Sequence, residues 1–181
     1  MTTLAGFTVL VVLVGLERLA ELVVSNRNAA WSLAHGGRET GRGHYPVMVV
    51  LHTGLLVGAL VEAWVRRPDV PAVLAWSMLA LVLASQGLRW WCIATLGRRW
   101  NTRVIVVPGL APVRSGPYRV FSHPNYVAVV VEGVALPLVH AAWLTAVVFT
   151  LANAVLLTVR IRVENAALRT LPAYDEGTVR A

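Results

Sequence analysis

The sequence has no lysine, one cysteine and few charged residues. All 16 basic residues are arginines and 9 residues are acidic, so charged side chains make up 14% of the 181 residues. The single cysteine, Cys92, excludes an intrachain disulfide and a metal cluster built from cysteines alone. No G-x-G-x-x-G element follows a strand-like run, and strand and helix patterns do not alternate. These absences exclude a soluble Rossmann-type fold.

Hydrophobic side chains, by contrast, make up 57% of the chain, and the mean hydropathy is +0.65. This composition is too apolar for an ordinary soluble domain of the same length. The apolar residues lie in runs of about the 20 residues that a membrane-spanning helix needs, not in the short alternating segments of a barrel. We therefore expect one all-α, polytopic integral membrane domain over residues 1–181, with the lipid bilayer as its surroundings.

The apolar runs predict about five transmembrane helices. Three of them fall within residues 1–92, and the last two, within residues 93–181, form a helical hairpin. The first run of the hairpin has only 14 residues and falls short of a hydrocarbon core of about 30 Å. A charged cytoplasmic helix is expected to follow, and the β-branched run near residues 104–107 favours a strand. The predicted helices are Leu4–Val24, Tyr45–Trp64, Ala72–Cys92, Tyr126–Val139, Ala141–Thr158 and Val159–Arg169.

The arginines also predict the orientation, because cytoplasmic connections of membrane proteins carry an excess of basic residues. With the N-terminus outside, only Arg66 and Arg67 of the loop arginines face outward. We therefore expect a multi-pass protein of the inner (plasma) membrane with a cytoplasmic C-terminus. The arginines do not interleave with aromatic residues on a soluble face, so no nucleic-acid partner is expected. The predicted cytoplasmic arginines are Arg27, Arg38, Arg42, Arg98, Arg99, Arg103, Arg114, Arg119, Arg160, Arg162, Arg169 and Arg180.

A polar motif, His123-Pro124-Asn125-Tyr126, stands directly before the first run of the hairpin. Pro124 is placed at or near the first helical position, where a missing N–H costs nothing. A helix N-terminus that carries a histidine and a tyrosine can hold an anion such as a carboxylate. The alternative is a structural role, in which Pro124 starts the helix, Asn125 caps it and Tyr126 anchors it at the interface.

A second motif follows the last apolar run and contains Arg160, Glu164 and Asn165. Arg160 and Glu164 are four residues apart, so they share one face of a helix. The alternative interpretation is a surface ion pair, which contributes less than about 1 kcal/mol. Among acidic residues in the apolar runs, we expect Glu62 to pair with Arg66 and Glu132 to face the site.

The two motifs together resemble the isoprenylcysteine carboxyl methyltransferase family. Members carry a G-x-Y-x-x-x-R-H-P-x-Y element before a membrane hairpin and an R-x-x-x-E-E-x-x-L element after it. The matching residues here are Gly116, Tyr118, His123, Pro124 and Tyr126, then Arg160, Glu164 and Leu168. Ser122 stands where the family has arginine, and Asn165 stands where it has a second glutamate. The N-terminal run E-R-L-A-E-L-V-V-S-N-R-N resembles a bacterial branch that O-methylates alkylpyrones and alkylresorcinols beside type III polyketide synthases.

The resemblance implies a methyltransferase that uses S-adenosyl-L-methionine and no metal. It assigns cofactor binding to Tyr118, His123, Pro124, Asn125 and Tyr126, and substrate orientation and proton handling to Arg160 and Glu164. The branch favours a phenolic or pyrone lipid as the lipophilic small-molecule acceptor, and no obligate protein partner is evident. A phenol, with a pKa near about 10, needs a base, for which Glu164 or His123 is the candidate. An acceptor carboxylate is already ionised, and Arg160 would hold it.

Three other functions remain open from the sequence. The first is a carboxyl methyltransferase of prenylcysteine-like substrates. The second is an NADPH-dependent membrane reductase of the sterol-reductase type, which shares a related C-terminal architecture. The third is a non-enzymatic membrane scaffold, which explains the apolar runs but not the two polar motifs.

Overall fold

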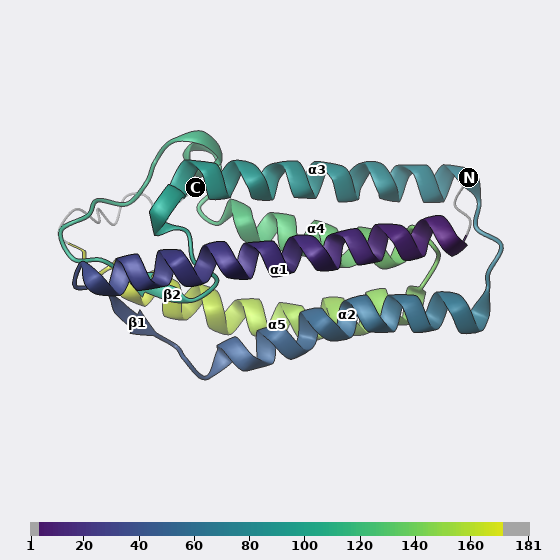
Figure 1. Cartoon of the computed structure of the whole chain (residues 1–181), viewed down its shortest axis with the longest axis horizontal. Helices are drawn as coiled ribbons and strands as arrows, with labels where there is room; N and C mark the ends of the chain where they lie inside the picture. The colour runs from purple at the N-terminus through teal and green to yellow at the C-terminus, as the bar shows by residue number, and fades with distance from the viewer. Residues whose placement is uncertain (1–3, 172–181) are drawn as a thin grey trace.

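The computed structural model describes residues 4–171 as a bundle of α-helices with a two-stranded sheet at one end (Figure 1). The abundance of helix confirms the predicted helical class. The α-helices are α1 Leu4–Ala34, α2 His44–Arg66, α3 Ala72–Leu96, α4 Pro124–Leu138 and α5 Trp143–Leu168. The strands are β1 Arg38–Thr40 and β2 Val104–Val106, and the 3-10 helices are η1 Gly97–Arg99 and η2 Gly116–Arg119.

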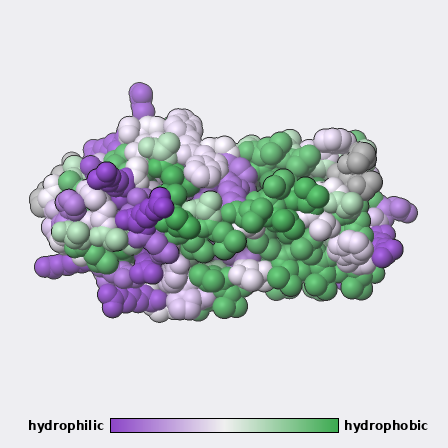
Figure 2. Space-filling view, viewed as in Figure 1, coloured by the Kyte–Doolittle hydropathy of each residue, from purple (hydrophilic) through white to green (hydrophobic). Residues whose placement is uncertain are grey.

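Three helices in the described part of the chain are long and apolar enough to cross a membrane: α2, α3 together with η1, and α5. Helix α4 is apolar but shorter, with 15 residues. Helix α1 is the longest, but it carries Glu17, Arg18 and Glu21. Figure 2 shows a mostly hydrophobic surface over much of the bundle and a hydrophilic end where the sheet lies. The chain is therefore a membrane protein, while the number of helices that cross and their orientation stay predictions.

Two predicted helix boundaries are wrong. Helix α1 continues to Ala34 through a segment expected to be a loop, because Ser25, Ala29 and Ser32 are spaced along one buried face and find packing partners. The separate charged helix predicted at Val159–Arg169 does not exist, since α5 runs unbroken to Leu168. No glycine or proline interrupts that stretch, so nothing in the sequence stops the helix.

Helices α4 and α5 pack against each other, as the predicted hairpin requires. The turn between them lies at residues 139–142, and Ala141 adopts a positive φ of 52°. The two helices are in tight contact at Gly133, where an added Cβ atom would lie 2.1 Å from the Phe149 ring. This glycine lets the short α4 lie tightly between α3 and α5.

The strand predicted in the β-branched run near residue 105 is present as β2. It pairs antiparallel with β1, with Glu39 opposite Ile105. The partner strand lies in the connection after α1, which the sequence did not identify as a strand. The sheet ties this connection to the loop that follows α3, and both lie at one end of the bundle (Figure 1), the end that is hydrophilic in Figure 2.

The main hydrophobic core lies toward the other end of the bundle. Phe7, Val11 and Val14 of α1 meet small side chains of α2 and large ones of α3 and α4. This packing joins the helices away from the sheet, so the loops at the sheet end are free to enclose a cavity. The other buried residues of this cluster are Ala59, Ala63, Val82, Ala135, Leu136 and Val139.

Candidate active site

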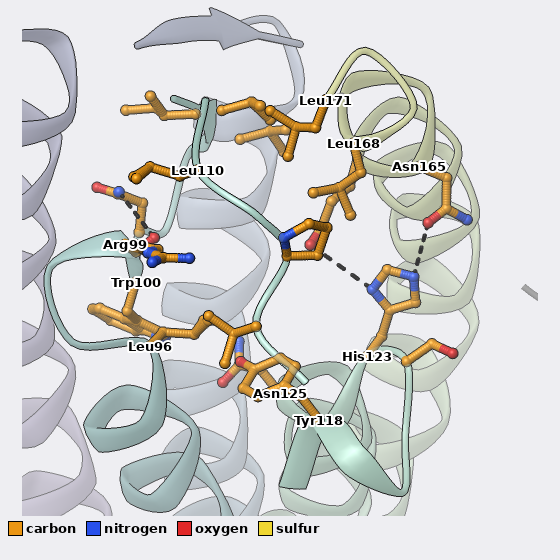
Figure 3. Close-up of a pocket in the computed structure, with 18 of the residues that line it drawn as sticks. Leu96, Arg99, Trp100, Leu110, Tyr118, His123, Asn125, Asn165, Leu168 and Leu171 are labelled. Carbon is orange, nitrogen blue, oxygen red and sulfur yellow. Dashed lines mark hydrogen bonds and ion pairs between the residues drawn. The ribbon is translucent and has the colours of Figure 1, made fainter. Parts of the chain in front are cut away.

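A cavity of about 740 Å³ opens at the sheet end of the bundle. Its wall is made by the loop after α3, the first turn of α4 and the last turns of α5 (Figure 3). Six of the seven predicted site residues line it, although the two motifs lie more than 30 residues apart. These six are Tyr118, His123, Asn125, Tyr126, Arg160 and Glu164. Pro124 is buried and does not line the cavity.

The start of α4 presents the first motif to this cavity. Pro124 is the first helical residue, as predicted, and His123 occupies the N-cap position without a side-chain capping bond. The Tyr126 N–H donates to the His123 carbonyl oxygen at 3.0 Å, which closes the first turn. Asn125 does not cap the helix, so the structural alternative for this residue is wrong. Its Oδ1 has no hydrogen-bond partner within the described chain and remains available as an acceptor.

Glu164 of α5 lies opposite this first turn. The Tyr126 hydroxyl donates a hydrogen bond to its Oε2. The other carboxylate oxygen, Oε1, lies 3.8 Å from Nδ1 of His123. The Glu164 side chain is 31% exposed, so it retains access to the cavity. A tyrosine and a histidine from one motif therefore converge on the carboxylate of the other.

Arg160 is almost completely buried, at 6% exposure. Its Nε donates to the Tyr126 hydroxyl at 3.0 Å, its Nη2 donates to the Thr102 carbonyl oxygen, and its Nη1 contacts the Met48 sulfur. Because Arg160 is buried and reaches Glu164 through Tyr126, the alternative of a surface ion pair is wrong. The guanidinium joins α5 to α4, α2 and the loop before β2.

Asn165 occupies the position at which the sequence departs from the family's second glutamate. Its Oδ1 lies 3.1 Å from Nε2 of His123 (Figure 3). The His123 ring also stacks on Tyr126, with centroids 5.3 Å apart and planes inclined by 21°. The asparagine thus keeps a partner on the imidazole without adding a negative charge. Ser122, the other departure, is exposed at the cavity wall.

The cavity wall is rich in positive charge. Glu164 is the one carboxylate among the lining residues that the structure describes, and five arginines accompany it. Burial, followed by the neighbouring Cys92 side chain, raises the pKa of Tyr118 above its usual range. Its hydroxyl therefore stays neutral. Such a wall favours ligand groups that carry negative charge. The lining arginines are Arg99, Arg103, Arg114, Arg119 and Arg160.

Two contacts of the site were not anticipated. Met48 and Thr102 both bind Arg160, yet neither was singled out from the sequence. A signal for Thr102 existed, because the segment W-N-T-R stands directly before the predicted strand. Glu132, expected to face the site, instead pairs with Arg89 of α3 at 2.5 Å and does not line the cavity.

Comparison with known proteins agrees with the motifs. The model of the "Isoprenylcysteine carboxyl methyltransferase (ICMT) family" matches residues 77–170, which include both motifs. The chain is 35% identical over 163 residues to the "Uncharacterized protein YpbQ" of Bacillus subtilis (strain 168), covering 90% of this chain and 96% of the relative. No solved structure matches the chain. The family match spans half of the sequence, and the protein belongs to the isoprenylcysteine carboxyl methyltransferase family.

Proposed function

We propose that the protein is an integral membrane O-methyltransferase that transfers the methyl group of S-adenosyl-L-methionine to a lipophilic acceptor, a phenolic or pyrone lipid hydroxyl. One observation carries this proposal. The two motifs of a methyltransferase family meet at one cavity of about 740 Å³. That volume is within the usual range of about 300–1,000 Å³ for small-molecule sites. The predicted orientation would place this cavity on the cytoplasmic side, where the cofactor is made.

The cofactor is assigned to the first motif and η2. Asn125 supplies a free amide oxygen, and the stacked rings of His123 and Tyr126 supply a planar wall. Tyr118 adds a neutral hydroxyl that lines the same cavity. Pro124 contributes by fixing the start of α4 rather than by contact. S-adenosyl-L-methionine offers both an amino-acid end and an adenine ring for such partners.

In the proposed reaction, the acceptor oxygen attacks the methyl carbon, the carbon–sulfur bond breaks and S-adenosylhomocysteine leaves. Holding the two reactants in line accounts for much of the rate in such a transfer. A phenolic acceptor also loses one proton, which Glu164 accepts directly or which His123 accepts at Nδ1. These two groups lie 3.8 Å apart, so either base would be assisted by the other.

Arg160 has a supporting role in this scheme. Its nitrogens already contact Tyr126, Thr102 and Met48, and the residue is 6% exposed. It therefore orients the acceptor by holding Tyr126 and, through it, Glu164. The positive charge of the cavity wall stabilises an acceptor oxygen that becomes an anion before transfer.

Calorimetry on the purified protein in detergent tests the cofactor. We expect S-adenosylhomocysteine to bind and NADPH not to bind. The reverse result would assign the chain to reductase chemistry and overturn the proposal. Mass spectrometry of lipid extracts, from cells with and without the protein, then identifies the acceptor as a species heavier by one methylene. A methyl ether supports a phenol or pyrone hydroxyl, whereas a methyl ester indicates a carboxylate acceptor.

The variants His123→Ala and Glu164→Ala test whether the cavity performs the transfer. Each is expected to lower methyl transfer to the identified acceptor by about 100-fold or more, the range typical of lost acid–base groups. Arg162→Ala, which replaces an exposed arginine on the same helix as Glu164, is the control. Full activity in both His123→Ala and Glu164→Ala would show that these residues do not carry out the transfer, whereas methyl transfer no faster than in membranes without the protein would favour a non-enzymatic scaffold.

A further inference from the structure

A second polar group lies inside the bundle, away from the cavity. We call it the charge cluster; it consists of Arg18 and Glu21 of α1, Gln86 and Arg89 of α3, and Glu132 of α4. Arg89 donates to Glu132 at 2.5 Å, and its Nε lies 3.7 Å from Glu21. Arg18 contacts Glu21 and Gln86, both at 2.8 Å, and lies 3.8 Å from Glu132. The cluster therefore joins three helices by side chains.

The central members are deeply buried. Arg89 is 5% exposed, and Glu21 and Glu132 are each 4% exposed. A buried ion pair contributes little net stability compared with apolar residues of the same size, but removing one partner leaves an uncompensated charge. Its best-attested role is to fix the register of packed elements. The arrangement of Arg89 and Glu132 is thus suited to specifying where α4 sits.

Helix α4 buries small residues (Ala128, Gly133) as well as large ones (Leu136, Leu138). Apolar contacts of this kind are not directional, whereas the ion pair with Arg89 defines how α4 is rotated at Glu132. At Gly133 the helix touches Phe149 of α5, and one residue earlier Glu132 is held by Arg89 of α3. Helix α4 is therefore in contact with α5 and with α3 at two consecutive residues, 133 and 132.

That level lies beneath the cavity. Glu132 follows Asn125 by seven residues, which is two helical turns and about 10 Å along the same face. Asn125 lines the cavity, as does Tyr126, whose hydroxyl must meet Glu164 of α5. A rotation or shift of α4 at the level of Glu132 would move both residues together.

We propose that Arg89 and Glu132 are positioning residues, which hold α4 so that Asn125 and Tyr126 face the cofactor cavity. This inference rests on the proposed function, because it assigns the cofactor to that cavity. The charge cluster then has a role beyond stability: by positioning α4 inside the bundle, it affects the affinity of the cavity for S-adenosyl-L-methionine. Neither residue touches the cofactor in this scheme.

The test compares two substitutions of equal chemistry at two buried glutamates. Glu132→Gln removes the charge that faces Arg89. Glu62→Gln is the matched control, because Glu62 is also buried but accepts hydrogen bonds from the Leu144 and Thr145 backbone at the far end of α5. Both variants are expected to lower the melting temperature in detergent. Only Glu132→Gln is expected to weaken S-adenosylhomocysteine binding, by about tenfold, at a temperature well below unfolding.

Kinetics separate positioning from stability in the same variants. Glu132→Gln should raise KM for S-adenosyl-L-methionine more than it lowers kcat, whereas a stability defect alone lowers the active fraction and leaves KM unchanged. Glu132→Asp, which keeps the charge but withdraws it by one methylene, should fall between wild type and Glu132→Gln. If Glu132→Gln does not fold, the double variant Arg89→Gln with Glu132→Gln replaces it, since it removes both partners of the pair.

The outcomes distinguish this inference from the proposed function. Failure of the wild-type protein to bind S-adenosylhomocysteine overturns the proposed function, and the inference with it. Wild-type binding combined with unchanged affinity and KM in the folded Glu132 or double variant overturns the inference alone. Equal loss of affinity in Glu62→Gln would also overturn it, because any buried carboxylate would then have the same effect.

Discussion

The hydroxyl of Tyr126 in α4 donates to the carboxylate of Glu164 in α5, although the two residues are 38 positions apart in the sequence. The same hydroxyl accepts a hydrogen bond from Arg160. One oxygen atom therefore joins the two motifs that identify the family. The contact is made because the turn at residues 139–142 folds α4 back along α5, and both motifs lie at the open end of this hairpin.

Tyr126→Phe removes that oxygen and leaves the ring that stacks on His123. Arg160 loses an acceptor and Glu164 loses a donor, and an unsatisfied buried group costs about 1–3 kcal/mol. We expect a lower melting temperature and at least a tenfold fall in methyl transfer. Tyr45→Phe is the control, because it keeps the ring face that Arg103 contacts. Full activity in Tyr126→Phe would show that Glu164 needs no partner from α4.

Arg160→Lys tests whether the site needs a guanidinium rather than a positive charge. Three separate nitrogens of Arg160 contact Tyr126, Thr102 and Met48. A lysine ammonium is a single point and cannot reproduce this fork. We expect Arg160→Lys to lose most of the activity and about 2 kcal/mol of stability, the scale of a charged hydrogen bond.

Arg162→Lys provides the comparison on the same helix, since Arg162 is exposed. It should change the melting temperature and the activity very little. The two measurements are thermal unfolding in detergent and initial rates of methyl transfer. Equal behaviour of the two lysine variants would mean that charge alone matters at residue 160.

Asn165→Ala tests the departure from the family's second glutamate. Its loss leaves Nε2 of His123 without the partner at 3.1 Å, so the ring keeps only the stacking on Tyr126 and the Glu164 carboxylate 3.8 Å from Nδ1. We expect a several-fold weaker affinity for S-adenosylhomocysteine, measured by calorimetry. Thr170→Ala, just after the end of α5, should retain wild-type affinity because, within residues 4–171, its hydroxyl bonds to the Ala167 carbonyl and not to the cavity. Unchanged affinity in Asn165→Ala would show that His123 does not need this orientation.

The sequence predicted the helical class and the convergence of the two motifs with good accuracy. Apolar runs of spanning length and a proline at the start of α4 are local signals, and they located α2, α3 and α4 to within a few residues. The His-Pro-Asn-Tyr and Arg-x-x-x-Glu motifs indicated the family, and the comparison confirms it. Order along the chain was enough to place both motifs at one end of a hairpin.

The remaining features depend on contacts between distant segments, which no local pattern encodes. The pairing of β1 with β2 and the extension of α1 both rely on packing of the segment after Ser25 against the loop near Thr102. Similarly, Glu132 was expected at the site because it shares a face with Asn125. The helix face was correct, but the partner was Arg89, which belongs to α3.

Gly133→Ala tests the close approach of α4 to α5. The added Cβ would lie 2.1 Å from Cε1 of Phe149, so the ring or the helix must move. Overpacking of this kind costs about 1–3 kcal/mol, and we expect a correspondingly lower melting temperature in detergent.

Gly87→Ala is the matched control within α3, because nothing lies within 4 Å of its added Cβ. That change should leave stability unchanged or raise it by up to about 1 kcal/mol, since alanine is the better helix former. Combining Gly133→Ala with Phe149→Leu should recover part of the loss, because the smaller side chain vacates the space. If Gly133→Ala were as stable as Gly87→Ala, the two helices would not be in the tight contact described for the hairpin.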